Sequence, residues 1–116
     1  MLFARYGETM PDGVLQVVEL WGPARERGLA HGEQCAAGIR AYAEERIDLA
    51  SRGVWNGLPV ERKEILALAE ACVPAHENYS SDLTDELRGV AEGSGCSVAE
   101  VIIAGGFTDF VDAVYG

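Results

Sequence analysis

Apolar and polar residues follow two different spacings along the chain, and the change divides it into a short front segment and a long helical remainder. Residues 14–20, VLQVVEL, are rich in β-branched side chains and follow a Pro-Asp-Gly turn at residues 11–13. Runs of this composition next to a turn are typical of strands. We therefore predict a strand over 14–20, with residues 1–6 as the candidate partner in a hairpin.

From Pro23 onward, apolar residues recur every three or four positions, which is the spacing of one helical face. Proline fits the first position of a helix, so the pattern predicts one helix from Pro23 to about Arg52. Its apolar face would be Ala36, Ile39, Tyr42 or Ala43, and Ile47. Glycine inside a helix costs up to about 1 kcal/mol relative to alanine. The three glycines in this run therefore predict close packing against another backbone: Gly28, Gly32 and Gly38.

A second helix begins at Pro59 and is ended or kinked at Pro74, because proline removes a backbone donor and clashes with the preceding turn. Ser80 or Ser81 would cap a third helix. Ser97, with Glu100 three residues later, forms a capping-box sequence before an apolar run. The buried positions expected in the second and third helices are Ile65, Leu66, Leu68, Ala69, Cys72, Leu83, Leu87, Val90 and Ala91.

The predicted fold class is α+β, mainly helical with an N-terminal strand or hairpin, in one domain over residues 1–116. Nineteen acidic against nine basic residues give a net charge of -10, which makes nucleic acid and anionic lipid poor partners. The sequence contains no apolar run long enough to span a bilayer and no signal-peptide pattern at its start. We expect a cytoplasmic protein.

The cysteines and histidines predict no metal site and no cofactor. Cys35, Cys72 and Cys96 are far apart, as are His31 and His76, and none has the spacing of zinc ligands. Buried structural thiols are the ordinary interpretation. A catalytic pair of His31 and Cys35, four apart on one helix, is a weaker alternative because no third group orients it.

The last twenty residues are apolar nearly throughout, and the sequence stops at Gly116 without a polar tail. Chain termini are usually polar and loosely held. We therefore expect Gly116 to be a cleavage point within a longer precursor. Asp109 and Asp112, three apart in this run, are either polar positions on a covered helix or carboxylates near a pocket.

Three segments, in this order, resemble the front part of the acyl-coenzyme A:6-aminopenicillanic acid acyltransferase family of N-terminal-nucleophile hydrolases. They are GPARERGLAHG at 22–32, LTDELRGVAEG at 83–93, and VAEVI at 98–102 followed by TDF at 108–110. The resemblance covers roughly residues 20–116. The chain departs from the family at 105–109, where it has no arginine before the acidic residue.

The resemblance implies that the chain is the α-subunit of a precursor that cuts itself between a glycine and a cysteine. This subunit would complete a four-layer αββα sandwich with a separate β-subunit, whose N-terminal cysteine is the nucleophile. The complex would cleave a small-molecule amide or thioester, and Gly116 would be the cleavage site. The residues expected to bind substrate are Thr108, Asp109, Phe110 and Tyr115, with Trp55 as a further candidate pocket aromatic.

A second interpretation treats the chain as a non-catalytic helical module that docks on a partner through its apolar C-terminal helix. The gene distinguishes the two, because the enzyme requires the reading frame to continue from Gly116 into cysteine.

Overall fold

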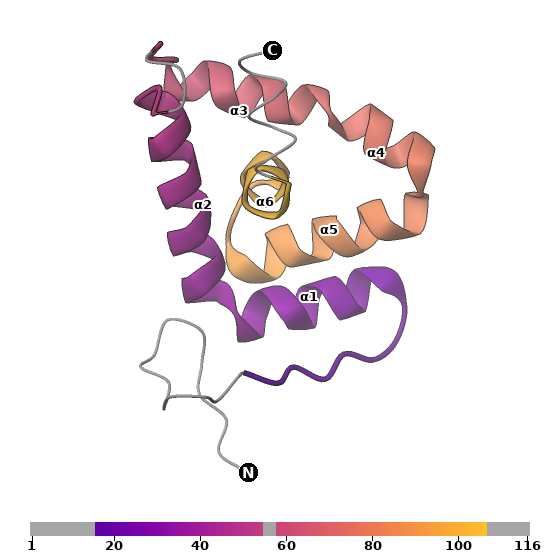
Figure 1. Cartoon of the computed structure of the whole chain (residues 1–116). Helices are drawn as coiled ribbons and strands as arrows, with labels where there is room; N and C mark the ends of the chain where they lie inside the picture. Colours follow the sequence, from indigo (N-terminus) through magenta and orange to yellow (C-terminus); the bar gives the residue numbers. More distant parts are fainter. Residues whose placement is uncertain (1–15, 55–57, 107–116) are drawn as a thin grey trace.

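The computed structural model describes residues 16–54 and 58–106 (Figure 1). Within these ranges the chain forms six helices joined by short connections. They are α1 (Ala24–Gln34), α2 (Ala36–Ser51), α3 (Arg62–Ala71), α4 (Val73–Tyr79), α5 (Ser81–Ser94) and α6 (Val98–Gly105).

Helix α6 lies inside a ring formed by α2, α3, α4 and α5, and α1 packs along the outer side of α5 (Figure 1). The centre of the core is the contact of α2 and α3 with α6. Its buried side chains are Ile47, Ala50, Ile65, Ala69, Ala99, Ile102 and Ile103. The apolar side chains of α6 are thus largely covered within this chain.

The prediction of an α+β fold with an N-terminal strand is wrong for the described part of the chain. Residues 16–20 run into α1 without forming a strand, and no strand occurs elsewhere in 16–54 or 58–106. A β-branched run becomes a strand only when a neighbouring strand supplies its backbone hydrogen bonds. The described residues provide no such neighbour. Residues 1–15, which include the predicted hairpin partner, lie outside the described part.

The helix predicted from Pro23 to Arg52 is two helices, because the backbone bends at Cys35. Cys35 has φ -113° and ψ 16°, outside the helical range. Its N–H still donates to the carbonyl oxygen of His31, and its own carbonyl oxygen accepts from the N–H of Ile39. The bend turns α2 away from α5 and toward α3 (Figure 1).

The second predicted helix also divides, at Cys72, and Pro74 lies in the first turn of the short helix α4. This agrees with the expected break near the proline. Proline is tolerated there because the first N–H groups of a helix have no partner within it.

The helix caps confirm the boundaries predicted for the helix after Ser80 and for the start of the helix after Ser97, whereas α3 begins at Arg62 and not at the predicted Pro59. Ser80 rather than Ser81 caps α5, and its hydroxyl accepts from the N–H of Leu83 at 3.2 Å. In the capping box of α6, the Ser97 hydroxyl accepts from the Glu100 N–H at 3.1 Å, and the Glu100 carboxylate accepts from the Ser97 N–H at 2.9 Å. Gly95 ends α5 in the left-handed region, with φ 76°.

The predicted core is partly wrong. Leu68 and Leu83 are exposed, although Ile65 and Ala69 on α3 and Val90 and Ala91 on α5 are buried. The sequence left open whether Tyr42 or Ala43 belongs to the apolar face of α2. Ala43 does, because it is fully buried, whereas Tyr42 is 40% exposed. Of the residues described, none belongs to a helix long and apolar enough to cross a membrane.

Candidate functional site

Four glycines hold α1 and α5 together at backbone-to-backbone distance. Gly28 and Gly32 lie on α1, and Gly89 and Gly93 lie on α5. A Cβ added at Gly89 would lie 2.7 Å from the backbone nitrogen of Leu29, and one added at Gly32 would lie 2.8 Å from the backbone nitrogen of Ser94. No side chain fits at these distances, so the close packing predicted for Gly28 and Gly32 is confirmed, with α5 as the partner.

The two helices run in the same direction. Gly28 lies against Glu86 and Val90, and Gly32, one turn later, lies against Val90 and Ser94. The C-terminal ends of α1 and α5, which carry partial negative charge, therefore lie at the same end of the helix pair. Arg40, near the start of α2, donates to the carbonyl oxygen of Ser94 at 2.8 Å and satisfies one of the free carbonyl groups at the end of α5.

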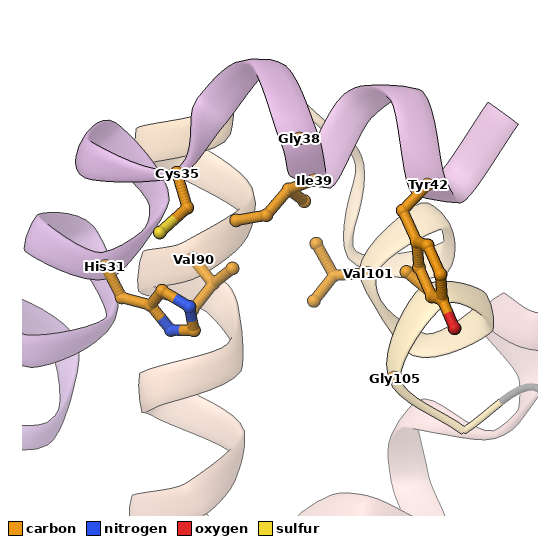
Figure 2. Close-up of a pocket in the computed structure, with 9 residues that line it drawn as sticks. His31, Cys35, Gly38, Ile39, Tyr42, Val90, Val101 and Gly105 are labelled. Carbon is orange, nitrogen blue, oxygen red and sulfur yellow. The ribbon is translucent and has the colours of Figure 1, made fainter. Parts of the chain in front are cut away.

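A pocket of about 190 Å³ lies beside this helix pair, at the bend between α1 and α2 (Figure 2). Figure 2 shows Ile39 and Val101 projecting into the same space, with His31 toward one end and Tyr42 toward the other. Residues from four helices form the wall: His31, Cys35, Gly38, Ile39, Tyr42, Val90, Val101, Ala104 and Gly105. Among residues 16–54 and 58–106, no arginine, lysine, aspartate or glutamate belongs to the wall.

Three of the described residues supply polar side-chain atoms to the wall. The His31 ring is half-buried, and the Cys35 thiol is almost completely buried, which raises the pKa of the thiol and keeps it neutral at pH 7. The Tyr42 hydroxyl accepts from Nη2 of Arg46 at 2.6 Å, and the Arg46 guanidinium lies over the Tyr42 ring, 4.4 Å from its centre.

His31 and Cys35 both line the pocket, but they do not form an activated nucleophile. Across residues 16–54 and 58–106, no hydrogen bond joins the His31 ring to the Cys35 thiol. An activated cysteine needs a lowered pKa and a base in contact with it. Burial shifts the pKa of Cys35 the other way.

The residues predicted to bind substrate or to be cleaved lie outside the described part of the chain, and so do the two aspartates considered as a carboxylate pair. They are Trp55, Thr108, Asp109, Phe110, Asp112, Tyr115 and Gly116. Within the described part, no group of acidic, histidine or cysteine side chains could hold a metal ion.

Sequence reasoning did not identify this pocket, because its wall also needs α5 and α6, which are distant from α1 and α2 in the sequence. The spacing of His31, Cys35 and Tyr42 puts them on one helical face, but it does not show what lies opposite that face. One signal was available in the composition of 98–105, which is apolar apart from Glu100 in its first turn. Such a helix predicts more than one covered face, and Val101 and Ala104 form the face toward the pocket.

Comparison of the chain with protein-family profiles and with curated protein sequences finds no match to either.

Proposed function

We propose that this chain is the α-subunit of an autoprocessed cysteine N-terminal-nucleophile amidohydrolase or acyltransferase. The packing of α1 on α5 carries the proposal. These helices contain the first two segments that resemble the family, 22–32 and 83–93, and the glycines of both segments form the contact between them. A chance resemblance of two separate helical segments would give no reason for their glycines to meet.

The proposed reaction begins with processing. A cysteine that follows Gly116 attacks the Gly116 carbonyl carbon, and the peptide bond is replaced by a thioester. Glycine suits this position because it has no side chain to shield the carbonyl and it tolerates strained backbone. Water then hydrolyses the thioester, which leaves Gly116 as a free carboxylate and the cysteine with a free α-amino group.

The mature nucleophile and its base are parts of the same residue in this proposal. An α-amino group has an ordinary pKa near 8 and can take the proton of the adjacent thiol. The thiolate attacks the carbonyl of a small amide or thioester, and an oxyanion hole on the β-subunit stabilises the tetrahedral intermediate. The acyl group then passes to water or to an amine. The residues proposed to shape the acyl site are Thr108, Asp109, Phe110 and Tyr115.

The partner implied by this function is a β-subunit from the same precursor, and the location proposed for the complex is the cytoplasm. No cofactor is needed, because the cysteine supplies both nucleophile and base. The net charge of -10 disfavours nucleic acid as a further partner.

The test is the intact mass, under denaturing conditions, of the product of the complete gene. We expect two species, one of 12.4 kDa that ends at Gly116 and one that begins with cysteine. Replacing that cysteine with alanine should leave one uncut species. A wild-type product that is never cut, or a reading frame that stops after Gly116, would contradict the proposal.

Two further variants connect the test to the helix pair. Gly28→Ala places a Cβ against the backbone of Glu86, and it should reduce the cut fraction by disturbing the fold that positions the cleavage site. The matched control is Gly105→Ala, where a Cβ meets nothing within 4 Å, and it should be processed like the wild type.

A helical interaction module is a second candidate, and the large exposed aromatic side chains favour it. Trp21 is 78% exposed and Tyr79 is 86% exposed, and aromatic side chains are enriched in protein interfaces. Ile102 and Ile103 of α6 are already covered by this chain, so docking would use these aromatics instead. A gene that ends after Gly116, with one product of 12.4 kDa, would favour this function.

A further inference from the structure

The pocket at the bend between α1 and α2 has the properties of a small-molecule site rather than of a packing defect. Its volume of about 190 Å³ exceeds the ~150 Å³ of an engineered apolar cavity that takes up benzene. Helices α1, α2, α5 and α6 contribute to its wall, so its shape depends on how these four helices pack and not on one loop.

The chemistry of the wall limits the charge of the occupant. Ile39, Val90, Val101 and Ala104 are apolar, and the described residues contribute no carboxylate, ammonium or guanidinium group to the wall. An ion that entered would lose hydration and gain no partner of opposite charge, which is strongly unfavourable. The occupant is therefore uncharged.

The polar atoms of the wall determine where the occupant can carry a polar group. The His31 ring, at one end of the pocket, has no hydrogen-bond partner among the described residues. The Cys35 thiol beside it is 2% exposed and likewise has no partner in 16–54 or 58–106. The His31 ring is half-buried, and its nitrogens are not cut off from water. An occupant with one hydroxyl or amide group at this end would take the place of water as the hydrogen-bond partner of the ring.

We propose that this pocket binds a small uncharged ring compound with one hydrogen-bonding group, of about the size of phenol or indole. The ring lies between Ile39, Val90 and Val101, and its polar group is directed to His31. This inference does not rest on the proposed function, because all the residues it uses belong to α1, α2, α5 and α6.

The probes that test the site are phenol, benzene and benzoate, which share a ring and differ in polarity and charge. Each compound is titrated into the full-length product of the gene. The NMR signals of the isoleucine and valine methyl groups are followed during the titration. We expect saturable shifts of Ile39, Val90 and Val101 with phenol, dissociation constants at least tenfold weaker with benzene, and no saturable shifts with benzoate. Benzoate binding as tightly as phenol, or phenol shifts that never saturate, would overturn the proposal.

Gly105→Leu is designed to block the pocket without disturbing the fold. A Cβ at Gly105 meets nothing within 4 Å, and this glycine lies in the pocket wall. We expect at least a tenfold loss of phenol affinity. The control is Ala67→Leu, an exposed position on α3 away from the wall, and it should bind phenol as the wild type does. Unchanged phenol affinity in Gly105→Leu would overturn the site.

His31→Leu separates the polar contact from the shape of the pocket. Phenol should bind this variant no better than benzene does, while benzene affinity should stay within about twofold of its wild-type value. If phenol kept its advantage over benzene, the assignment of its polar group to His31 would be wrong. The dispersion of the methyl spectrum shows in each case whether the variant is folded.

Discussion

A Cβ atom on Gly89 of α5 would lie 2.7 Å from the backbone nitrogen of Leu29 on α1. This distance is shorter than side-chain carbons reach in native proteins, so the two helices can approach only because both carry glycine at the crossing. The same relationship holds one turn later, where a Cβ on Gly93 would lie 2.8 Å from the backbone nitrogen of Glu33. The helix pair is thus fixed by backbone shape and not by interdigitating side chains.

Alanine at Gly89 should destabilise the protein, although alanine is the better helix former. The added methyl group has to push α1 away from α5, and overpacking of this kind typically costs about 1–3 kcal/mol. Urea denaturation at pH 7 measures the free energy of unfolding. Gly105→Ala is the control, since its methyl group enters open space, and it should be neutral or stabilising by up to about 1 kcal/mol. Equal effects of the two substitutions would show that the crossing is not tightly packed.

Ser80 and Ser81 should respond differently to alanine, because only Ser80 caps α5. Loss of a capping hydroxyl costs about 0.5–2 kcal/mol, and the N–H of Leu83 would lose its acceptor. Ser81 is exposed and lies inside the helix, where a change to alanine should alter stability by less than about 0.5 kcal/mol. Thermal and urea denaturation of the two variants should give this order. A larger loss of stability at Ser81 than at Ser80 would indicate that Ser81 is the capping residue and that α5 begins one residue later.

Ile103 should be the most sensitive apolar residue of α6. Its side chain is completely buried against α2 and α3, so Ile103→Ala should cost about 2–5 kcal/mol. Val101 faces the pocket and is half-buried. Val101→Ala should therefore cost less than half as much. Comparable losses at the two positions would mean that the pocket face of α6 is packed as tightly as the core.

The buried thiol of Cys35 should make stability fall in alkaline solution. Burial raises the pKa of Cys35 in the folded state, while the unfolded thiol ionises near pH 8.5. The folded state then binds more protons, so the free energy of unfolding decreases as the pH rises above about 8.5. Urea denaturation from pH 7 to 10 should show this decrease in the wild type and a smaller one in Cys35→Ala. Identical pH profiles of the wild type and Cys35→Ala would show that the Cys35 thiol does not cause the loss of stability.

The reactivity of the three cysteines provides an independent check on the same burial. Cys72 and Cys96 are half-buried, whereas Cys35 is almost inaccessible. A thiol reagent should therefore modify two cysteines quickly and Cys35 only as the protein opens. Mass spectrometry of digested samples assigns each modification to its residue.

Local signals in the sequence were sufficient to predict the end of α5 and the start of α6, but they did not reveal contacts between distant segments. Ser97 with Glu100, and Gly95 before them, determine their own backbone geometry through nearby hydrogen bonds, so they could be identified from sequence alone. The glycines on α1 predicted a close contact but could not identify α5 as the partner. The bend at Cys35 was missed, because cysteine is not a helix breaker and the bend follows from how α2 packs on α3 and α6.

The strand was predicted but does not form in the described residues. Residues 16–20 have a composition suited to a strand, but strand formation depends on a partner that composition does not reveal. Leu68 and Leu83 are a related case, since helical periodicity placed them on a core face that the ring of helices leaves open.

The pairing of α1 with α5 also has a consequence for the order of folding. Arg25 and Glu92, which form an ion pair across the two helices at 2.8 Å, are 67 positions apart in the sequence. Helix α1 can dock only after the chain between them has brought α5 into place, and closing so long a loop costs entropy that local contacts do not. The element that docks last is expected to open first. Amide hydrogens of α1 should therefore exchange with deuterium before those of α2, α3 and α6, although all are equally helical.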